Sequence, residues 1–114
     1  MQVQVQAELL KRDEVLAEIV RRLAETYQPR SIYLFGSTAR GDRGPGSDYD
    51  ILVVVADKTP REQRSSGRGY ECLWGMGTAV DVLVCTEGYL RSRARVRTSL
   101  PARVMREGKL LYAA

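Results

Sequence analysis

Histidine is absent from this chain of 114 residues. Its absence excludes histidine-based catalytic triads, histidine general bases and histidine metal ligands from within the chain. Cysteine is scarce: Cys72 and Cys85 lack any metal-ligand spacing, and we expect both to be reduced apolar fillers. Carboxylates must therefore carry any metal or general-base chemistry.

Long apolar runs are also missing. The longest, residues 51–56 and 82–85, fall far short of the roughly 20 residues that span a bilayer. The N-terminal residues contain no apolar signal core. We therefore expect a cytoplasmic protein without membrane contact. The length predicts one domain over residues 1–114 with a single hydrophobic core.

Lysine is rare among the basic residues, because arginine outnumbers it fifteen to three in a chain of net charge +4. Arginine favours phosphate and carboxylate partners through its bidentate fork. One cluster, Arg91, Arg93, Arg95 and Arg97, alternates with small or apolar residues. It would form one basic face if extended and would spread around the axis if helical. A solvated surface and a contact surface for RNA, a nucleotide or an acidic partner are both open here.

The hydrophobic pattern predicts alternating helices and strands. Helices are expected over residues 7–27, where Gln28-Pro29 ends the pattern, over 38–40, from Thr59-Pro60 onward, from Thr86 through the arginine cluster, and over 99–107. Strands are expected over 31–35, 48–56, 79–85 and 109–112, with a loop over 41–47. This order predicts an α/β (α+β) fold with a mixed sheet and helices on one or both faces.

A Gly-Ser step follows the first expected strand. Gly36 lets the backbone approach a ligand closely, and Ser37 lies at the expected start of a helix, where unpaired N–H groups favour anions. These two residues are therefore candidates for binding a phosphate group. Arg40 is a candidate for a further phosphate contact, although it could equally pair with Asp42 or Asp48 as part of the structure.

Three aspartates lie at the beginnings of expected strands. Asp48 and Asp50 project to the same side of one strand, and two adjacent carboxylates either share a proton or bind a cation. Without histidine or cysteine nearby, oxygen ligands point to Mg²⁺ or Mn²⁺. If the next strand is a neighbour, Asp81 joins the site, either to bind metal or to accept the proton of an attacking hydroxyl. Each piece alone is more often structural, but their joint occurrence indicates a site.

The spacing Gly36-Ser37, ten residues, Asp48-x-Asp50 resembles the signature of the minimal nucleotidyltransferases, a family of the DNA polymerase beta superfamily. The resemblance extends over about residues 31–112, including the strand with Asp81, and is poor over 61–77. It implies a polymerase-beta-like nucleotidyltransferase fold. It also implies transfer of a nucleoside monophosphate from a nucleoside triphosphate to a hydroxyl, with release of pyrophosphate.

The resemblance further assigns roles to these residues. Asp48 and Asp50 would bind two Mg²⁺ ions, Asp81 would complete the catalytic metal site, and Gly36 with Ser37 would hold the triphosphate. Minimal members of this length resemble antitoxins of type VII toxin–antitoxin pairs, which form a complex with a HEPN-domain ribonuclease toxin and transfer AMP from ATP to a toxin tyrosine. The resemblance therefore implies a protein partner, and we do not expect direct nucleic-acid binding.

Two alternatives remain open at this point. The chain could be a non-catalytic antitoxin that masks its toxin by binding alone. It could also be a homodimeric nucleotidyltransferase for a small molecule, with the acceptor bound across the interface.

Overall fold

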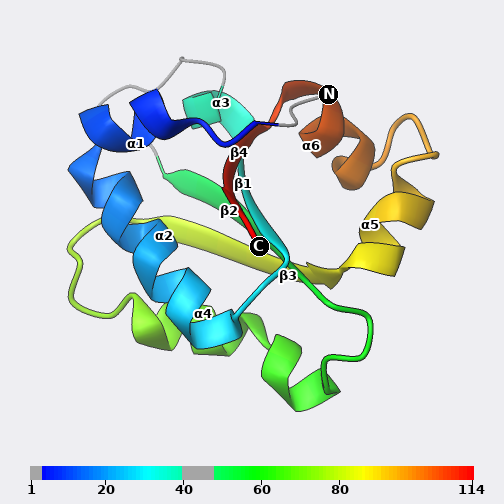
Figure 1. The fold of residues 1–114 in the computed structure, drawn as a ribbon, viewed down its shortest axis with the longest axis horizontal. Helices are drawn as coiled ribbons and strands as arrows, with labels where there is room; N and C mark the ends of the chain where they lie inside the picture. Colours follow the sequence, from blue (N-terminus) through cyan, green and yellow to red (C-terminus); the bar gives the residue numbers. More distant parts are fainter. Residues whose placement is uncertain (1–3, 40–47) are drawn as a thin grey trace.

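A four-stranded mixed sheet forms the centre of the computed structural model, which describes residues 4–39 and 48–114 (Figure 1). Its strands are β1 (Ser31–Phe35), β2 (Tyr49–Val55), β3 (Val80–Thr86) and β4 (Lys109–Ala113), in the order β3-β2-β1-β4. β1 pairs antiparallel with β2 and β4, whereas β2 and β3 are parallel. The predicted mixed sheet is confirmed, and the parallel pair brings the beginnings of β2 and β3 together.

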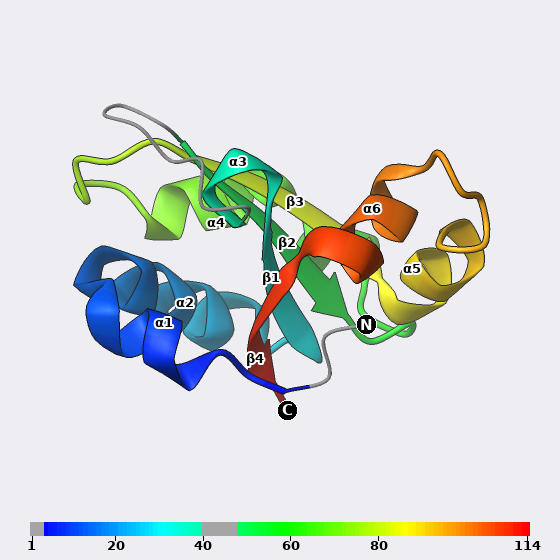
Figure 2. The ribbon, with the colours of Figure 1, turned by 90° about the horizontal axis from the view of Figure 1, so that it is seen from above.

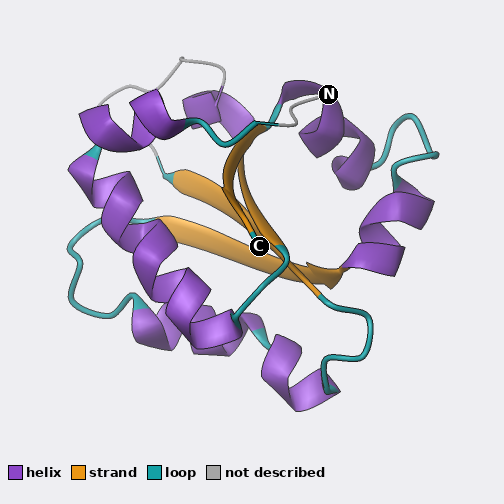
Figure 3. Cartoon of the chain, in the orientation of Figure 1, coloured by secondary structure: helices purple, strands orange, loops and turns teal. Residues whose placement is uncertain are grey.

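Helices cover both faces of this sheet (Figures 2 and 3). The helices are α1 (Ala7–Arg12), α2 (Glu14–Tyr27), α3 (Gly36–Ala39), α4 (Ser66–Cys72), α5 (Glu87–Arg93) and α6 (Leu100–Glu107), with a 3₁₀ helix η1 (Arg61–Arg64). α1, α2 and α4 lie on one side of the sheet, and α5 and α6 lie on the other. None of the described helices is long and apolar enough to cross a membrane.

β2 is apolar on both faces because each face meets a separate layer of side chains. Ile51, Val53 and Val55 pack in the larger core with α2, while Leu52 and Val54 pack in the smaller core with α6 and β4. A strand covered on both faces gives the continuous apolar run seen in the sequence. The alternation also fixes which β2 side chains share a face with Asp50.

The helix predicted over residues 7–27 is divided at Asp13, which corrects that prediction. Asp13 has extended backbone angles, and its side chain accepts a hydrogen bond from the Leu16 N–H at 3.0 Å. Its second carboxylate oxygen accepts one from the Tyr49 hydroxyl at 2.7 Å. An aspartate that caps an unpaired N–H begins a new helix, and the apolar periodicity continues across such a break.

The helix expected after Thr59-Pro60 is η1 followed by a separate helix, α4. The Ser65 side chain accepts a hydrogen bond from the Gly67 N–H at 3.0 Å and caps α4. Gly69 lies inside α4, where a Cβ would be only 2.9 Å from a methyl of Val82 and 3.0 Å from the Tyr27 hydroxyl. Glycine at this position thus permits α4 to pack closely on β3 and α2.

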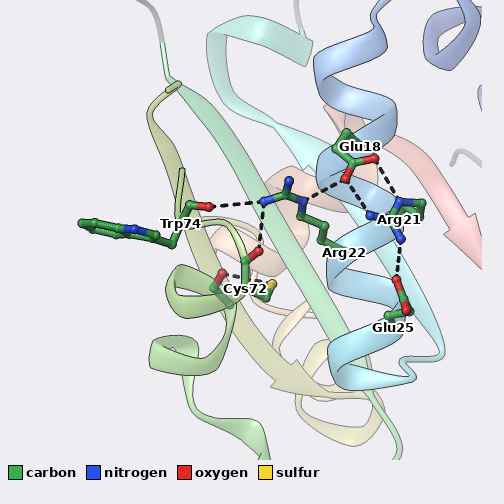
Figure 4. Close-up of polar contacts among 7 residues, drawn as sticks. Glu18, Arg21, Arg22, Glu25, Cys72 and Trp74 are labelled. Atoms are coloured by element: carbon green, nitrogen blue, oxygen red, sulfur yellow. Dashed lines mark hydrogen bonds and ion pairs between the residues drawn. The ribbon is translucent and has the colours of Figure 1, made fainter. Parts of the chain in front are cut away.

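An arginine links α2 to the end of α4 (Figure 4). The Nε of Arg22 donates to Glu18 at 2.8 Å. Its Nη1 donates to the carbonyls of Cys72 at 3.3 Å and Trp74 at 3.4 Å. Arg21 also pairs with Glu18. Hydrogen bonds from Arg21 and Arg22 lower the pKa of Glu18 to about 2. These contacts fix the turn that leads the chain into β3.

Candidate active site

The beginnings of β2 and β3 place two of the predicted carboxylates in contact. Asp50 and Asp81 are direct partners in the parallel register, so their side chains lie on the same face of the sheet. Asp50 is half-buried and Asp81 is exposed. The sequence placed Asp81 in the site only if its strand neighbours the strand of Asp50. The parallel pairing of β2 and β3 confirms this arrangement.

The ionisation of Asp50 reflects this crowding. Burial, followed by the negative charge of Asp81, a side-chain hydrogen bond with Asp81 and the charge of Asp48, raises the pKa of Asp50 above its ordinary value. Each of these causes disfavours the ionised carboxylate of Asp50 in the protein alone. A cation beside Asp50 would act in the opposite direction, so the pair is suited to hold either a shared proton or a positive ion.

Gly36 lies directly against Asp50. Its φ of +74° falls in the left-handed region, and a Cβ there would collide with a carboxylate oxygen of Asp50 and come within 3.2 Å of the Asp50 Cγ. Any other residue would therefore be strained and would displace the carboxylate. Glycine at this position therefore leaves space for the Asp50 carboxylate, which the sequence did not show. The close approach of a ligand to Gly36 stays a prediction.

Thr38, which the sequence analysis did not single out, connects the Gly-Ser turn to β2. The Thr38 hydroxyl donates to the carbonyl of Asp48 at 2.9 Å. This bond ties α3 to the residue before β2 and so sets the position of the Asp48–Asp50 segment relative to Gly36. A threonine directly after a Gly-Ser step is too common to have been recognised as functional.

For the other predicted site residues the structure describes fewer contacts. Asp48 precedes β2, is exposed and affects Asp50 through its charge. Over residues 4–39 and 48–114, no group of three or more acidic, histidine or cysteine residues is gathered closely enough to hold a metal. Ser37 belongs to α3, while Arg40 and the expected loop 41–47 lie outside the described residues. The three-aspartate metal site and the phosphate contacts of Ser37 and Arg40 therefore stay predictions.

The donor chemistry nevertheless fits a hard divalent cation. Asp50 and Asp81 supply adjacent carboxylate oxygens, and Asp48 adds a third negative charge that acts on Asp50. Oxygen ligands of this kind suit Mg²⁺ or Mn²⁺ and do not suit thiophilic metals.

An apolar groove of about 470 Å³ lies on the carboxylate face of the sheet. Leu52 and Leu83, two residues beyond Asp50 and Asp81, line it together with Tyr89 and Leu100. The alternation of strand side chains places the groove about 7 Å along the sheet from the carboxylates. Nothing in the sequence predicted this groove, because Leu83 and Leu100 have the character of ordinary core residues.

Known proteins share this architecture. A crystal structure from Sulfolobus solfataricus, itself assigned by inference as a nucleotidyltransferase, has a TM-score of 0.58 and 26% identity, covering 88% of this chain and 78% of that chain. A crystal structure of a toxin–antitoxin with AMP-PNP has a TM-score of 0.57 and 26% identity, covering 85% of this chain and 73% of that chain.

A curated relative is similar over a shorter stretch. MJ1215 of Methanocaldococcus jannaschii, whose name as a protein adenylyltransferase is an inferred assignment, is 45% identical over 40 residues. That stretch is 35% of this chain and 46% of the relative, so the match spans less than half of the relative's length.

The sequence model of the nucleotidyltransferase domain matches residues 16–109. This range runs from inside α2 to the first residue of β4 and includes all of the predicted site residues. The chain belongs to the nucleotidyltransferase domain family.

Proposed function

We propose that this chain is a Mg²⁺-dependent protein adenylyltransferase that transfers AMP from ATP to a tyrosine of a HEPN-domain toxin and so acts as the antitoxin. The observation that carries the proposal is the contact of Asp50 with Asp81 on adjacent parallel strands, directly beside Gly36. Family membership supports nucleotidyl transfer. The name of the M. jannaschii relative and the toxin–antitoxin bound to AMP-PNP favour AMP as the group and a toxin as the partner.

In this proposal the carboxylates of Asp48, Asp50 and Asp81 hold the ions. Bound Mg²⁺ would offset the charge of the triphosphate and stabilise the entering and leaving oxygens of an in-line displacement. Burial and the charge of Asp81 raise the pKa of Asp50, and a positive charge beside it would favour its ionised form. Gly36 keeps the space around the Asp50 carboxylate open.

The chain's own part in the reaction is to place the acceptor and receive its proton. Asp81 is exposed, so its carboxylate is accessible to a tyrosine hydroxyl from outside the chain. The tyrosine oxygen bonds to the α-phosphorus of ATP, and the bond from that phosphorus to the bridging oxygen breaks. Pyrophosphate leaves, and the phenolic proton passes to Asp81.

Labelled ATP tests this proposal. The chain, Mg²⁺ and the product of the neighbouring gene, which we expect to be a HEPN-domain protein, are incubated with α-labelled ATP, and label on the partner is measured. Asp50→Asn or Asp81→Asn should reduce the labelling rate by about 100-fold or more, because each removes charge from the site. Glu71→Gln, on an exposed residue of α4, is the matched control and should label normally.

Other outcomes would favour the alternatives. If the Asp50→Asn/Asp81→Asn double variant still neutralises the toxin in growing cells, the chain acts by binding alone. Modification of an aminoglycoside without any protein partner would instead indicate a small-molecule nucleotidyltransferase. An unlabelled partner with the wild-type chain would contradict the proposed activity.

A further inference from the structure

Positive charge is concentrated in one segment of the chain. Residues 91–106 contain six arginines and no acidic residue, a charge of +6. Because the whole chain carries +4, the remaining residues together carry −2. The basic character of the protein therefore comes entirely from the end of α5, the turn that follows and α6, which we call the arginine segment.

The arginines of this segment are exposed and few are neutralised. All six, Arg91, Arg93, Arg95, Arg97, Arg103 and Arg106, are exposed. Arg91 lies 4.0 Å from a carboxylate oxygen of Asp57, at the limit of an ion pair. Among the residues that the structure describes, Arg93, Arg95 and Arg97 have no carboxylate partner within ion-pair distance. Such charges are available to an acidic surface outside the chain.

The segment is held in a defined shape. α5 ends at Arg93 instead of continuing through the cluster, and the chain then turns toward α6. The Ser99 hydroxyl donates to the Arg93 carbonyl at 2.6 Å, and Arg106 donates to the Arg97 carbonyl at 3.2 Å. The arginines thus lie neither on one extended face nor around one helix. A turn closed by hydrogen bonds loses less entropy when it binds a partner.

The arginines of α5 and of the turn after it, Arg91 to Arg97, lie far from the carboxylates. β3 runs from Asp81 near its beginning to Thr86 at its end, a distance of about 17 Å at the usual rise of a strand. α5 follows that far end, and both ribbon views show α5 away from the beginnings of β2 and β3 (Figures 1 and 2). Arg91, Arg93, Arg95 and Arg97 are therefore too far away to hold the triphosphate at Asp50 and Asp81.

Apolar side chains lie among the arginines. Val96 is 42% exposed and Tyr89 is 53% exposed. Tyr89 also lines the apolar groove, with Leu83 and Leu100, that approaches the carboxylates along the same face. Protein interfaces combine an apolar centre with a polar rim and are enriched in arginine. Single-stranded RNA is bound on several stacking aromatic rings, and this surface offers only Tyr89.

We propose that the arginine segment and the adjoining groove bind an acidic surface of the acceptor protein. The arginines would pair with carboxylates of the partner, and the groove would take an apolar side chain next to the tyrosine that reaches Asp81. This inference rests on the proposed function for the identity of the partner, the HEPN-domain protein. It adds a second contact area, distant from the ATP site, that selects the acceptor by charge.

Charge reversal tests the inference. Binding of the HEPN-domain protein is measured by calorimetry without ATP for the wild-type chain, for Arg93→Glu/Arg95→Glu and for Lys11→Glu/Arg12→Glu. Both double variants change the net charge by the same amount, and all four residues are exposed. The arginine-segment variant should weaken binding by about 10-fold or more, and the α1 variant by less than about threefold. Added salt should weaken wild-type binding more than that of the arginine-segment variant.

Two further measurements, of turnover and of RNA binding, complete the test. The arginine-segment variant should raise KM for the protein acceptor and leave kcat and KM for ATP nearly unchanged, because it removes binding without touching the carboxylates. A fluorescent single-stranded RNA of mixed sequence is tested in parallel. Equal weakening by the two double variants, or loss of RNA binding with toxin binding unchanged, would overturn the inference.

Failure of the proposed function is distinguishable from failure of this inference. The wild-type chain could transfer no AMP and still bind the partner in a salt-dependent way that Arg93→Glu/Arg95→Glu weakens. That result would support the docking surface and contradict the proposed activity. If AMP transfer proceeds and both double variants bind and react as the wild type does, the proposed activity is supported and the docking surface is contradicted.

Discussion

Replacing Gly36 should both strain the backbone and disturb the site. Gly36→Ala should lower the free energy of unfolding by about 1–3 kcal/mol, because alanine at positive φ is strained and its Cβ collides with Asp50. AMP transfer should fall as well, since the Asp50 carboxylate must move. Urea unfolding and the labelling assay measure the two effects.

Gly77 provides the matched control for this substitution. Its φ is +72°, but no atom lies within 4 Å of the position a Cβ would take. Gly77→Ala should therefore show the strain alone, about 1 kcal/mol, with normal AMP transfer. Equal loss of activity in both variants would contradict a specific contact between Gly36 and Asp50.

Cys85 should be unreactive in the folded chain. It packs against the smaller core, and burial raises the pKa of its thiol from 9.0 to about 11. At pH 8 the raised pKa lowers the thiolate fraction by about 100-fold, and only the thiolate is alkylated. In a Cys72→Ser chain, labelling of Cys85 by iodoacetamide should be slow when folded and fast in urea, as followed by mass spectrometry. Equal rates in both conditions would contradict the burial of Cys85.

At the scale of elements, Asp13 determines how α2 begins. Asp13→Ala removes the cap on the Leu16 N–H and the hydrogen bond from the Tyr49 hydroxyl. The free energy of unfolding should fall by about 1–3 kcal/mol. Thermal melts of Asp13→Ala, Tyr49→Phe and the double variant should show less than additive losses, because the two residues share one hydrogen bond. Strict additivity would show that Asp13 acts as a helix cap alone.

The sequence predicted most elements because their signals are local. The apolar runs of β1 and β2, the Ser99 cap of α6 and the Thr86 cap of α5 are all readable within a few residues. The break at Asp13 and the end of α5 at Arg93 were missed. Asp13 receives a hydrogen bond from Tyr49, a contact between distant segments that periodicity does not contain. At the end of α5, the Arg93 carbonyl accepts a hydrogen bond from the Ser99 hydroxyl, which the apolar pattern does not show either.

The same limit applies to the site. The sequence predicted that Asp81 joins the site if its strand neighbours the strand of Asp50, and the parallel register of β2 and β3 places the two residues side by side. The sequence could not show that Gly36 contacts Asp50 or that a groove follows Leu83. These features require the distances between strands, helices and the Gly-Ser turn, which only the fold supplies.

For the whole molecule, charge and chemistry are divided between the two ends of β3. Asp81 lies near its beginning, with Asp50 beside it, and the arginine segment follows its end. The described part of the chain offers carboxylates for a cation and an exposed basic surface for a partner. In our proposal ATP binds at one end of β3 and the acceptor protein docks at the other, with the apolar groove between them.

The most direct test of the central claim is the mass of the HEPN-domain protein after incubation with ATP, Mg²⁺ and this chain. With the wild-type chain we expect a mass gain of one or more AMP units, located by fragmentation on a tyrosine. With the Asp50→Asn/Asp81→Asn double variant we expect no gain. An unchanged mass with the wild-type chain, or the same gain with the double variant, would contradict the proposed activity.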